Sequence, residues 1–484
     1  MQEIMHTVGI DVGTTTTQVI FSRLTLENTA SVVSVPRVSI VDREVVYKSP
    51  IAFTPLLDKE TINAENLRVV IEKEYAAAGM RPDDISAGAV IITGETARKR
   101  NAETVLHSLA GLAGEFVVTT AGSDLESLLA GRGAGTEQLS RERDGGFANL
   151  DIGGGTTNLA LFRNGAVLDT SCLDIGGRHV LVDAASMTVT SISPQYRRLM
   201  ASMGLTLREG GPADIAQLQR LTDRCAAIIA EILRILPPSE AMRQLITNKD
   251  FRDPPPVAGV TLSGGVAASL LATEQRPPEN SAELFAHGDI GILQAISLRE
   301  SALCRGIPLY PAKETIRATV VGIGVQLVEL SGSTIFYTRA ERLPLKNIPV
   351  LKLAAEEEAR GPEELAAAIR KKIAWFNHED NTGLVGICLA GPRNPSYAQV
   401  VALARAIADG GREMAAKTRM LAVLVENDLA KSLGNALYAE MGGVPDIFCL
   451  DAVNAENGDY IDIGKPMAGG RVLPVAVKSL LFGK

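Results

Sequence analysis

Asp11 and Asp151 each follow an apolar run and stand two residues before the first glycine of a turn. In residues 9–21 the turn contains Gly13 and four threonines, and in residues 149–162 it contains three glycines and two threonines. Glycine lets the backbone approach a ligand without a Cβ in the way, and successive N–H groups in such a turn form a cradle for an anion. A carboxylate beside the cradle can hold a hydrated cation or orient a water. These residue types therefore indicate phosphate binding.

One such turn alone could be an ordinary glycine-rich β-turn. The two aspartates, however, lie 140 residues apart (151 − 11), and a repeat of this kind indicates two related halves that face each other across a ligand. A third element, residues 260–269, is an apolar run that leads into Gly264-Gly265 and then into a helix. A helix N-terminus with a bare backbone can receive the sugar or base edge of a nucleotide. Together the three elements predict a nucleotide site.

The surrounding pattern indicates what positions these turns. Each stretch is expected to form a strand, a tight turn and a second strand, so that the turn lies at the tip of a hairpin. Apolar spacing predicts a helix over residues 59–79 and another over residues 214–236, where two prolines end it. A continuous apolar run predicts a buried strand over residues 87–93.

The last part of the chain alternates predicted helices with short apolar strands, which indicates a small α/β domain with a mainly parallel sheet. The helices are expected at 362–376, 397–410 and 429–441, and the strands at 384–390, 421–425 and 446–450. Residues 315–337 read as two strands, and residues 458–471 read as an extended loop. We therefore predict three domains, at 1–120, 121–311 and 312–484.

Composition limits the class of protein. The chain has 484 residues, of which 46% are hydrophobic and 21% charged, as in ordinary globular proteins. Its net charge is −8 and it has no basic run, so we expect no nucleic-acid or anionic-membrane partner. Neither a signal peptide nor an apolar stretch of transmembrane length is evident. The five scattered cysteines fit reduced thiols, and we expect a cytoplasmic protein.

The two hairpins and the Gly-Gly element resemble the phosphate-1, phosphate-2 and adenosine motifs of the actin-like ATPase superfamily. Residues 121–131 and 288–297 resemble its two connecting segments, and the order of the motifs matches that superfamily as far as about residue 305. The resemblance implies an α/β fold of two duplicated βββαβα-type halves around a nucleotide cleft. A C-terminal α/β domain is added to these halves.

The amino-acid sequences of several segments resemble one family more closely, the ethanolamine ammonia-lyase reactivating factors. The segments are residues 9–21, 92–99, 121–127, 149–158 and 458–466, and the resemblance spans nearly the whole chain. It implies a chaperone of ethanolamine ammonia-lyase that uses ATP and Mg²⁺ to release damaged cobalamin, so that intact adenosylcobalamin can enter. It also implies weak ATPase activity and an ethanolamine-utilisation setting, and it leaves open whether the protein associates with a microcompartment.

The resemblance implies a role for each residue that matches a motif. Backbone and hydroxyl groups of Gly13, Thr14, Thr15, Gly153, Gly154, Gly155 and Thr156 would cradle the β- and γ-phosphates, and Ser263, Gly264 and Gly265 would border the adenosine. Asp11 and Asp151 would bind Mg²⁺ mainly through its waters. Asp151 or Glu126 would position the attacking water. A structural role is expected for His179.

Several alternatives stay open. A small-molecule kinase on the same superfamily fold is the rival function, although we find no acidic base beside a hydroxyl-substrate site. The lysine that heat-shock chaperones place near the γ-phosphate has no match by motif, and Lys48, Lys59 and Lys73 are all possible. The surface that binds the lyase and any homo-oligomer cannot be read from the residues.

Overall fold

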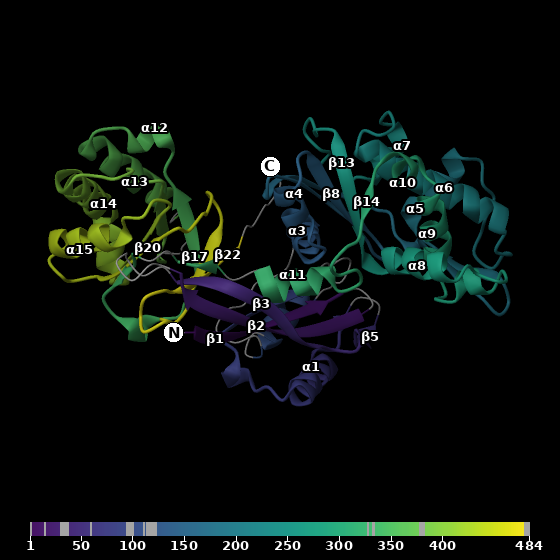
Figure 1. Ribbon diagram of the computed structural model, residues 1–484, viewed down its shortest axis with the longest axis horizontal. Helices are drawn as coiled ribbons and strands as arrows, with labels where there is room; N and C mark the ends of the chain where they lie inside the picture. The colour runs from purple at the N-terminus through teal and green to yellow at the C-terminus, as the bar shows by residue number, and fades with distance from the viewer. Residues whose placement is uncertain are drawn as a thin grey trace.

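The chain forms two sheet-based halves and a C-terminal α/β domain, shown by the computed structural model in Figure 1. The structure describes residues 2–13, 16–29, 38–58, 61–92, 101–109, 112, 123–326, 329–331, 334–376 and 383–478. Thr14, Thr15 and Lys59 of the predicted site lie outside these residues.

The first half is one sheet with helices on one face. Its elements are β1 (Gln2–Val12), β2 (Thr16–Asn28), β3 (Val38–Lys48), β4 (Ala52–Phe53), β5 (Leu56–Asp58), β6 (Thr61–Ile62), α1 (Ala64–Ala78), β7 (Ala87–Ile92) and α2 (Ala102–Leu109). The strand order is β3-β2-β1-β7, with β1 and β7 parallel. Asn63 caps α1 by accepting a hydrogen bond from the Asn66 N–H, and Gly79 ends the helix at φ 67°. The helix predicted at 59–79 is confirmed over Ala64–Ala78, although Thr61–Ile62 form β6 instead, and the strand predicted at 87–93 is confirmed over Ala87–Ile92.

The second half repeats this layout. Its main elements are α3 (Ser123–Gly133), α4 (Thr136–Glu142), β8 (Gly146–Ile152), β9 (Thr157–Arg163), β10 (Ala166–Leu173), α6 (Ile215–Ile232), β13 (Val257–Ser263), α8 (Gly264–Gln275) and β14 (Leu309–Tyr310). Smaller ones are β11 (Val180–Asp183), β12 (Thr188–Ile192), α5 (Pro194–Ser202), α7 (Glu240–Leu245), α9 (Gly291–Arg299) and α10 (Ala302–Gly306). The order β10-β9-β8-β13, with β8 and β13 parallel, is that of β3-β2-β1-β7. Both halves are therefore of the βββαβα type, as in the actin-like ATPase fold.

Two helices, α11 (Ala318–Gln326) and α3, lie between the two sheets and pack on each other (Figure 1). A Cβ on Gly322 would overlap the Leu129 carbonyl, and a Cβ on Gly133 would overlap that of Ala318, so the two backbones touch directly. Apolar residues of α3 and α11 join residues of β1's sheet in one buried cluster. The crossed pair thus connects the two halves.

Helix α11 corrects two predictions. Residues 318–326 form a helix where a strand is predicted, because packing on both sides favours a helix there despite its β-branched residues. The two predicted strands are reduced to two residues each, Glu329–Leu330 and Phe336–Tyr337. Residues 288–297 do not form the second connecting segment, since α9 packs on α6 and α8 instead. It is α11 that contacts α3. The part of the chain after residue 312 therefore begins with a helix that belongs to the layer between the halves.

The C-terminal domain is built on an eight-stranded mixed sheet in the order β15-β22-β21-β17-β18-β19-β20-β16. Its strands are β15 (Glu329–Leu330), β16 (Phe336–Tyr337), β17 (Leu345–Lys352), β18 (Gly386–Leu389), β19 (Met420–Val425), β20 (Asp446–Asp451), β21 (Tyr460–Ile463) and β22 (Pro474–Lys478). Its helices are α12 (Ala355–Glu358), α13 (Pro362–Phe376), α14 (Tyr397–Thr418) and α15 (Ala430–Glu440). Strands β17 to β20 are parallel, which confirms the predicted α/β alternation. The predicted loop at 458–471 is wrong, since it contains β21.

The C-terminal domain packs on the first half. Met5 and Leu24 of the first sheet share a buried apolar cluster with Val472 and Ala476. The Ala468 N–H also donates to the Glu3 carboxylate over 2.5 Å. The C-terminal domain is therefore joined to the first sheet by a buried core.

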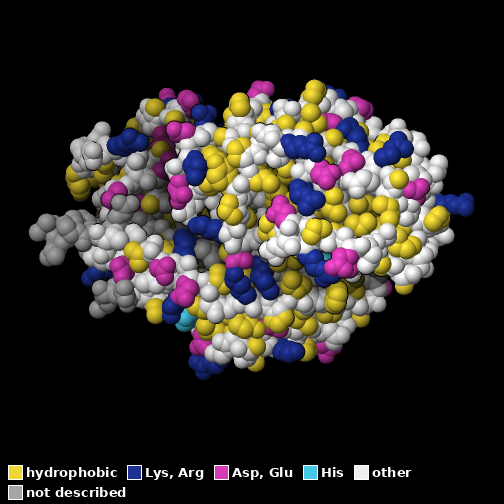
Figure 2. All heavy atoms as spheres, turned by 45° about the vertical axis from the view of Figure 1, so that its right-hand side comes forward, with side chains coloured by type: hydrophobic (Ala, Val, Ile, Leu, Met, Phe, Trp, Pro, Cys, Tyr) yellow, Lys and Arg dark blue, Asp and Glu magenta, His cyan; other side chains and the backbone are white. Residues whose placement is uncertain are grey.

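On the face in Figure 2, basic and acidic side chains are interspersed and apolar side chains lie between them. Within the described residues, no helix is both long and apolar enough to cross a membrane.

Candidate nucleotide site

The two glycine-rich hairpins have the same internal geometry. The Gly13 N–H donates to Thr16 O and the Gly153 N–H donates to Thr156 O, each over 2.9 Å. Their strands pair in the same register, so that Asp11 lies opposite Gln18 and Asp151 lies opposite Asn158. Every one of these positions differs from its counterpart by 140. The predicted internal repeat is confirmed at the level of single hydrogen bonds.

Both aspartates face the layer of α3 and α11. Ile10 and Ile152 are the neighbours of the two aspartates along their strands. Each points to the other face of its own sheet, into the core that helices cover on that face. The first sheet reaches the start of α11 through Gln18, whose amide donates to the Ile316 carbonyl over 3.4 Å. The second sheet reaches it at Thr319, whose hydroxyl lies close enough to Asp151 to lower the pKa of that carboxyl. The two hairpins therefore converge on the start of one helix.

Asp151 is buried and ends a chain of hydrogen bonds across β8 and β13. Ser263 donates to Asp151 Oδ1 over 2.7 Å, and the Asn149 amide donates to the Ser263 hydroxyl over 3.0 Å. Thr261 in turn donates to Asn149 over 2.8 Å. Burial raises the pKa of Asp151 to about 6, although the Ser263 and Thr319 hydroxyls act in the opposite direction. The network fixes the carboxyl group, which is mostly ionised at neutral pH and takes up a proton near pH 6.

Each aspartate has an amide beside it with an unsatisfied oxygen. Gln18 Oε1 and Asn158 Oδ1 are both buried and accept no hydrogen bond from the protein. A buried acceptor left unpaired costs free energy, so these oxygens call for a donor or a cation that the protein alone does not supply. Carboxylate and amide oxygens are suited to Mg²⁺, which keeps most of its waters and uses one or two carboxylates. The residues at Asp11 and Asp151 therefore fit a hydrated Mg²⁺.

The carbonyls of the second turn are held from behind by residues 177–179. The N–H of Gly177 donates to Gly153 O over 3.1 Å and that of Arg178 donates to Gly154 O over 2.7 Å. His179 Nε2 lies 2.6 Å from Gly155 O. Residues 177–179 hold the carbonyl groups on one side of the second turn. The N–H groups of the turn are thereby fixed on its other side, where they can bind an anion.

His179 is more closely tied to the site than the sequence indicated. The ring is buried, stacks on Tyr196 at 4.4 Å between centroids, and its Nδ1 lies 2.7 Å from the Ser193 hydroxyl. It therefore positions the second turn through Gly155. The preceding Gly176-Gly177 is the sequence feature that could have indicated this close contact, because a Cβ on Gly176 would overlap Gly154.

The Gly-Gly element has the predicted strand–helix form. Gly264 adopts φ 87° and a Cβ there would overlap Ile152 O, so glycine is required at this position. A Cβ on Gly265 would meet no atom within 4 Å, which leaves its surroundings open to a ligand. The Ser263 side chain is completely buried and points at Asp151. Ser263 thus supports the carboxylate, whereas the open backbone is that of Gly265.

Glu126 lies in the first turn of α3, the helix that packs on β8, β9 and β10. Ser263, Asp151, Asn158 and Cys172 form one row across these strands and β13. Burial is the main reason why the pKa of Cys172 is raised, and the charge of Glu126 adds to it. A catalytic role for Glu126 stays a prediction.

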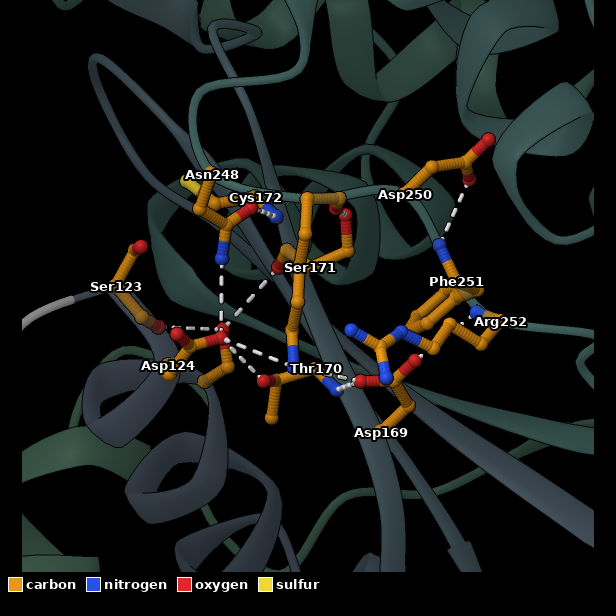
Figure 3. A network of polar contacts seen from close by, with 12 residues as sticks. Ser123, Asp124, Asp169, Thr170, Ser171, Cys172, Asn248, Asp250, Phe251 and Arg252 are labelled. Carbon is orange, nitrogen blue, oxygen red and sulfur yellow. Dashed lines mark hydrogen bonds and ion pairs between the residues drawn. The ribbon is translucent and has the colours of Figure 1, made fainter. Parts of the chain in front are cut away.

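Figure 3 shows what holds the start of α3, which carries Glu126. Asp124 accepts hydrogen bonds from the Thr170 hydroxyl and, over 3.0 Å, from the Asn248 amide. The Lys249 ammonium group lies 2.8 Å from the carboxylate of Asp169, which is on β10, the edge strand that also carries Thr170. The helix start is thereby tied to β10. Asp124, in the first turn of α3, makes this connection.

The two cavities that the described part of the chain presents most clearly lie elsewhere. One of about 270 Å³ lies between α3 and β10, and one of about 420 Å³ lies in the C-terminal domain beside α12 and α14. Neither cavity is lined by residues of the two hairpin turns. The nucleotide site is therefore identified from the backbone geometry of those turns and not from a cavity. Of the possible lysines, Lys48 forms an ion pair with Glu314, and Lys73 is exposed on α1, on the far face of the first sheet.

Comparison with known families agrees with this geometry. The family model described as "Ethanolamine utilisation protein EutA" matches residues 3–483. The chain belongs to the EutA family. It is 37% identical to the ethanolamine ammonia-lyase reactivase EutA of Salmonella typhimurium and 36% identical to that of Escherichia coli, in each case over 98% of both chains. A solved structure of ethanolamine utilisation protein EutJ from Carboxydothermus hydrogenoformans covers 66% of this EutA-family chain and 89% of its own, at 17% identity and a TM-score of 0.32.

Proposed function

We propose that this chain is a reactivase of ethanolamine ammonia-lyase that uses ATP and Mg²⁺ to release damaged cobalamin. The observation that carries the proposal is the pair of matched hairpins, which reach the start of α11 through Gln18 and Asp151. Identity of 36–37% over nearly the full length of two proteins named as reactivases supports the choice of client. The reactivase acts in the cytoplasm.

The two turns bind the phosphates of ATP. Gly154, Gly155 and Thr156 present N–H groups from the second half, and Thr156 adds a hydroxyl. Gly13 and Gly153 close the two turns through their own N–H groups and let the backbone approach the phosphates. The clamp formed by Gly177, Arg178 and His179 supports this role, because it fixes the second turn before ATP arrives. Gly264 and Gly265 border the adenosine, where the open space beside Gly265 admits a ligand.

Mg²⁺ is held mainly through its waters by Asp11 and Asp151. The unpaired oxygens of Gln18 and Asn158 support this role, because water molecules of the ion can donate to them. The ion supplies positive charge against the phosphate oxygens when it is bound. We assign no protein side chain to supply this positive charge in place of the ion.

Asp151 positions the attacking water and accepts its proton. Its raised pKa, about 6, suits a group that must gain a proton near neutral pH. Glu126, in the first turn of α3, is the alternative that the sequence offers for this role.

Loss of the γ-phosphate is relayed to the client by motion of one half against the other. The crossed helices α3 and α11 form the connection, and their glycine contacts make it compact. The C-terminal domain shares a core with the first sheet, so it moves with that half. The relay therefore changes the position of the C-terminal domain relative to the second half.

The test uses ethanolamine ammonia-lyase that carries a cobalamin without its adenosyl group. The protein is added with Mg²⁺, free adenosylcobalamin, and either ATP or a non-hydrolysable analogue, and ammonia release is followed. Recovery that needs hydrolysable ATP is the expected result. Absence of recovery, together with transfer of phosphate to a small hydroxyl compound, would replace the proposal by the kinase alternative.

A further inference from the structure

Residues 48–58, which we call the strap, carry an exposed apolar segment. Phe53 is 78% exposed and Leu57 is 66% exposed, and between and beside them Ile51 and Leu56 are exposed to 42% and 41%. Residues 49–57 contain no charged side chain. Scattered apolar residues are normal on a protein surface, but four within seven positions form a patch.

The strap is bonded to the first hairpin turn. Strand β4 pairs with the start of β2, where Phe53 lies opposite Thr16. The Thr54 hydroxyl donates to the Gly13 carbonyl over 2.8 Å and lies 3.0 Å from the Thr17 hydroxyl. A force on the exposed side chains is therefore transmitted directly to the backbone of the first turn.

The strap is also bonded to the linker between β14 and α11, residues 311–317. Lys48 forms an ion pair with Glu314, and Arg317 donates to Ser49 O over 3.0 Å. Within the same linker, Thr315 O accepts a hydrogen bond from the Gly264 N–H over 3.1 Å. The strap thus contacts the first turn directly. Through residues 314–317 of the linker it is also connected to the Gly-Gly element.

We infer that the exposed side chains of the strap are a docking surface for ethanolamine ammonia-lyase, and that docking there is coupled to the nucleotide site. The inference rests on the proposed function for the identity of the partner. Because the strap is bonded to both halves, closing or opening of the nucleotide site changes its position. A client bound to Phe53 and Leu57 is then held or released with the nucleotide state.

The size and charge of the patch favour a protein client over a second copy of this chain. Four side chains exposed to this extent present on the order of 400 Å², the range of the larger functional patches on monomers. A stable dimer needs about 800 Å² from each partner, so the patch suits a contact that is made and broken in each cycle. Its lack of charge requires an apolar surface on the partner.

The test compares the double variant Phe53→Ser with Leu57→Ser against the wild type. The matched control is Val444→Ser, which removes an 82% exposed valine from the C-terminal domain. Binding to lyase that carries cyanocobalamin is measured with ATP and with ADP, beside ATP hydrolysis without lyase and the mass of the protein in solution. We expect at least tenfold weaker lyase binding in the double variant only, with hydrolysis and mass unchanged.

Each other outcome has a distinct meaning. Unchanged lyase binding by the double variant, while the wild type reactivates the lyase, overturns the docking surface and leaves the proposed function in place. A fall in mass from dimer to monomer with lyase binding retained assigns the patch to self-association and also overturns the inference. Failure of the wild type itself to bind or reactivate the lyase contradicts the proposed function instead.

Discussion

Ser263 donates a hydrogen bond to Asp151 over 2.7 Å, from the strand that enters the Gly-Gly element to the strand that enters the second turn. This contact joins two of the three sequence motifs inside the core, where no solvent screens it. It makes the ionisation of Asp151 depend on a residue that faces no ligand. Several tests follow from this arrangement.

Asp151→Asn is expected to stabilise the nucleotide-free protein while it abolishes ATP hydrolysis. Asp151 has a pKa raised from 3.8 to about 6, so the native state binds a proton more tightly than the unfolded state. The stability this gives is present at low pH and is lost as pH rises through about 4 to 6. Above that window the ionised carboxylate costs up to about 3 kcal/mol, which asparagine avoids.

Thermal unfolding of both proteins at several pH values checks this prediction. The variant should unfold at a higher temperature than the wild type at pH 7.5, and the difference should shrink as pH falls through 6. A variant that is equally or less stable at pH 7.5 would show that burial does not destabilise the charge of Asp151.

ATP hydrolysis by the wild type should fall as pH is lowered through about 6, and Ser263→Ala should move that midpoint to higher pH. Removal of a donor to the ionised form raises the pKa of Asp151 further. The variant should also lose about 1–3 kcal/mol of stability, because the Asn149 amide loses its acceptor. Ser269→Ala, which removes a hydroxyl bonded within α8, is the matched control. An unchanged midpoint in Ser263→Ala would remove Asp151 as the group that titrates.

His179→Ala is expected to weaken ATP binding by about five- to tenfold, because Gly155 loses a hydrogen bond that positions the second turn. His179→Gln, which can still donate to the Gly155 carbonyl, should recover part of the affinity. Equilibrium binding of a fluorescent ATP analogue measures both. A loss of affinity that glutamine does not relieve at all would assign His179 to core packing on Tyr196.

Gly322→Ala is expected to cost about 1–3 kcal/mol of stability and to slow reactivation, because its methyl group would overlap the backbone of α3. Gly306→Ala is the control, since a Cβ there meets no atom within 4 Å. Denaturant unfolding gives the free energies. Equal stability of the two variants would mean that α3 and α11 separate without cost.

The motifs could be predicted because their chemistry depends on local spacing. The aspartates, the turn glycines and their 140-residue offset fix the hairpins, and the helix at residues 215–232 follows from its apolar stripe and from Asp214 at its N-cap. Such features need no knowledge of what packs against them.

Other parts depended on tertiary contacts that no local pattern records. Residues 318–326 are rich in β-branched residues and glycine, and they form a helix only because α3 and the first sheet enclose them. Ser263 is adjacent to the open glycines, yet its rotamer turns it toward Asp151. His179 reaches Gly155 only after β11 and α5 fold around it.

Release of damaged cobalamin can be measured directly. Lyase that carries cyanocobalamin is mixed with Mg²⁺, ATP and either the wild type or Asp151→Asn, and free cobalamin is measured by its absorbance after filtration. We expect release by the wild type with ATP, and none with the non-hydrolysable analogue or with the variant. Release that is equal for the wild type and Asp151→Asn would contradict this expectation.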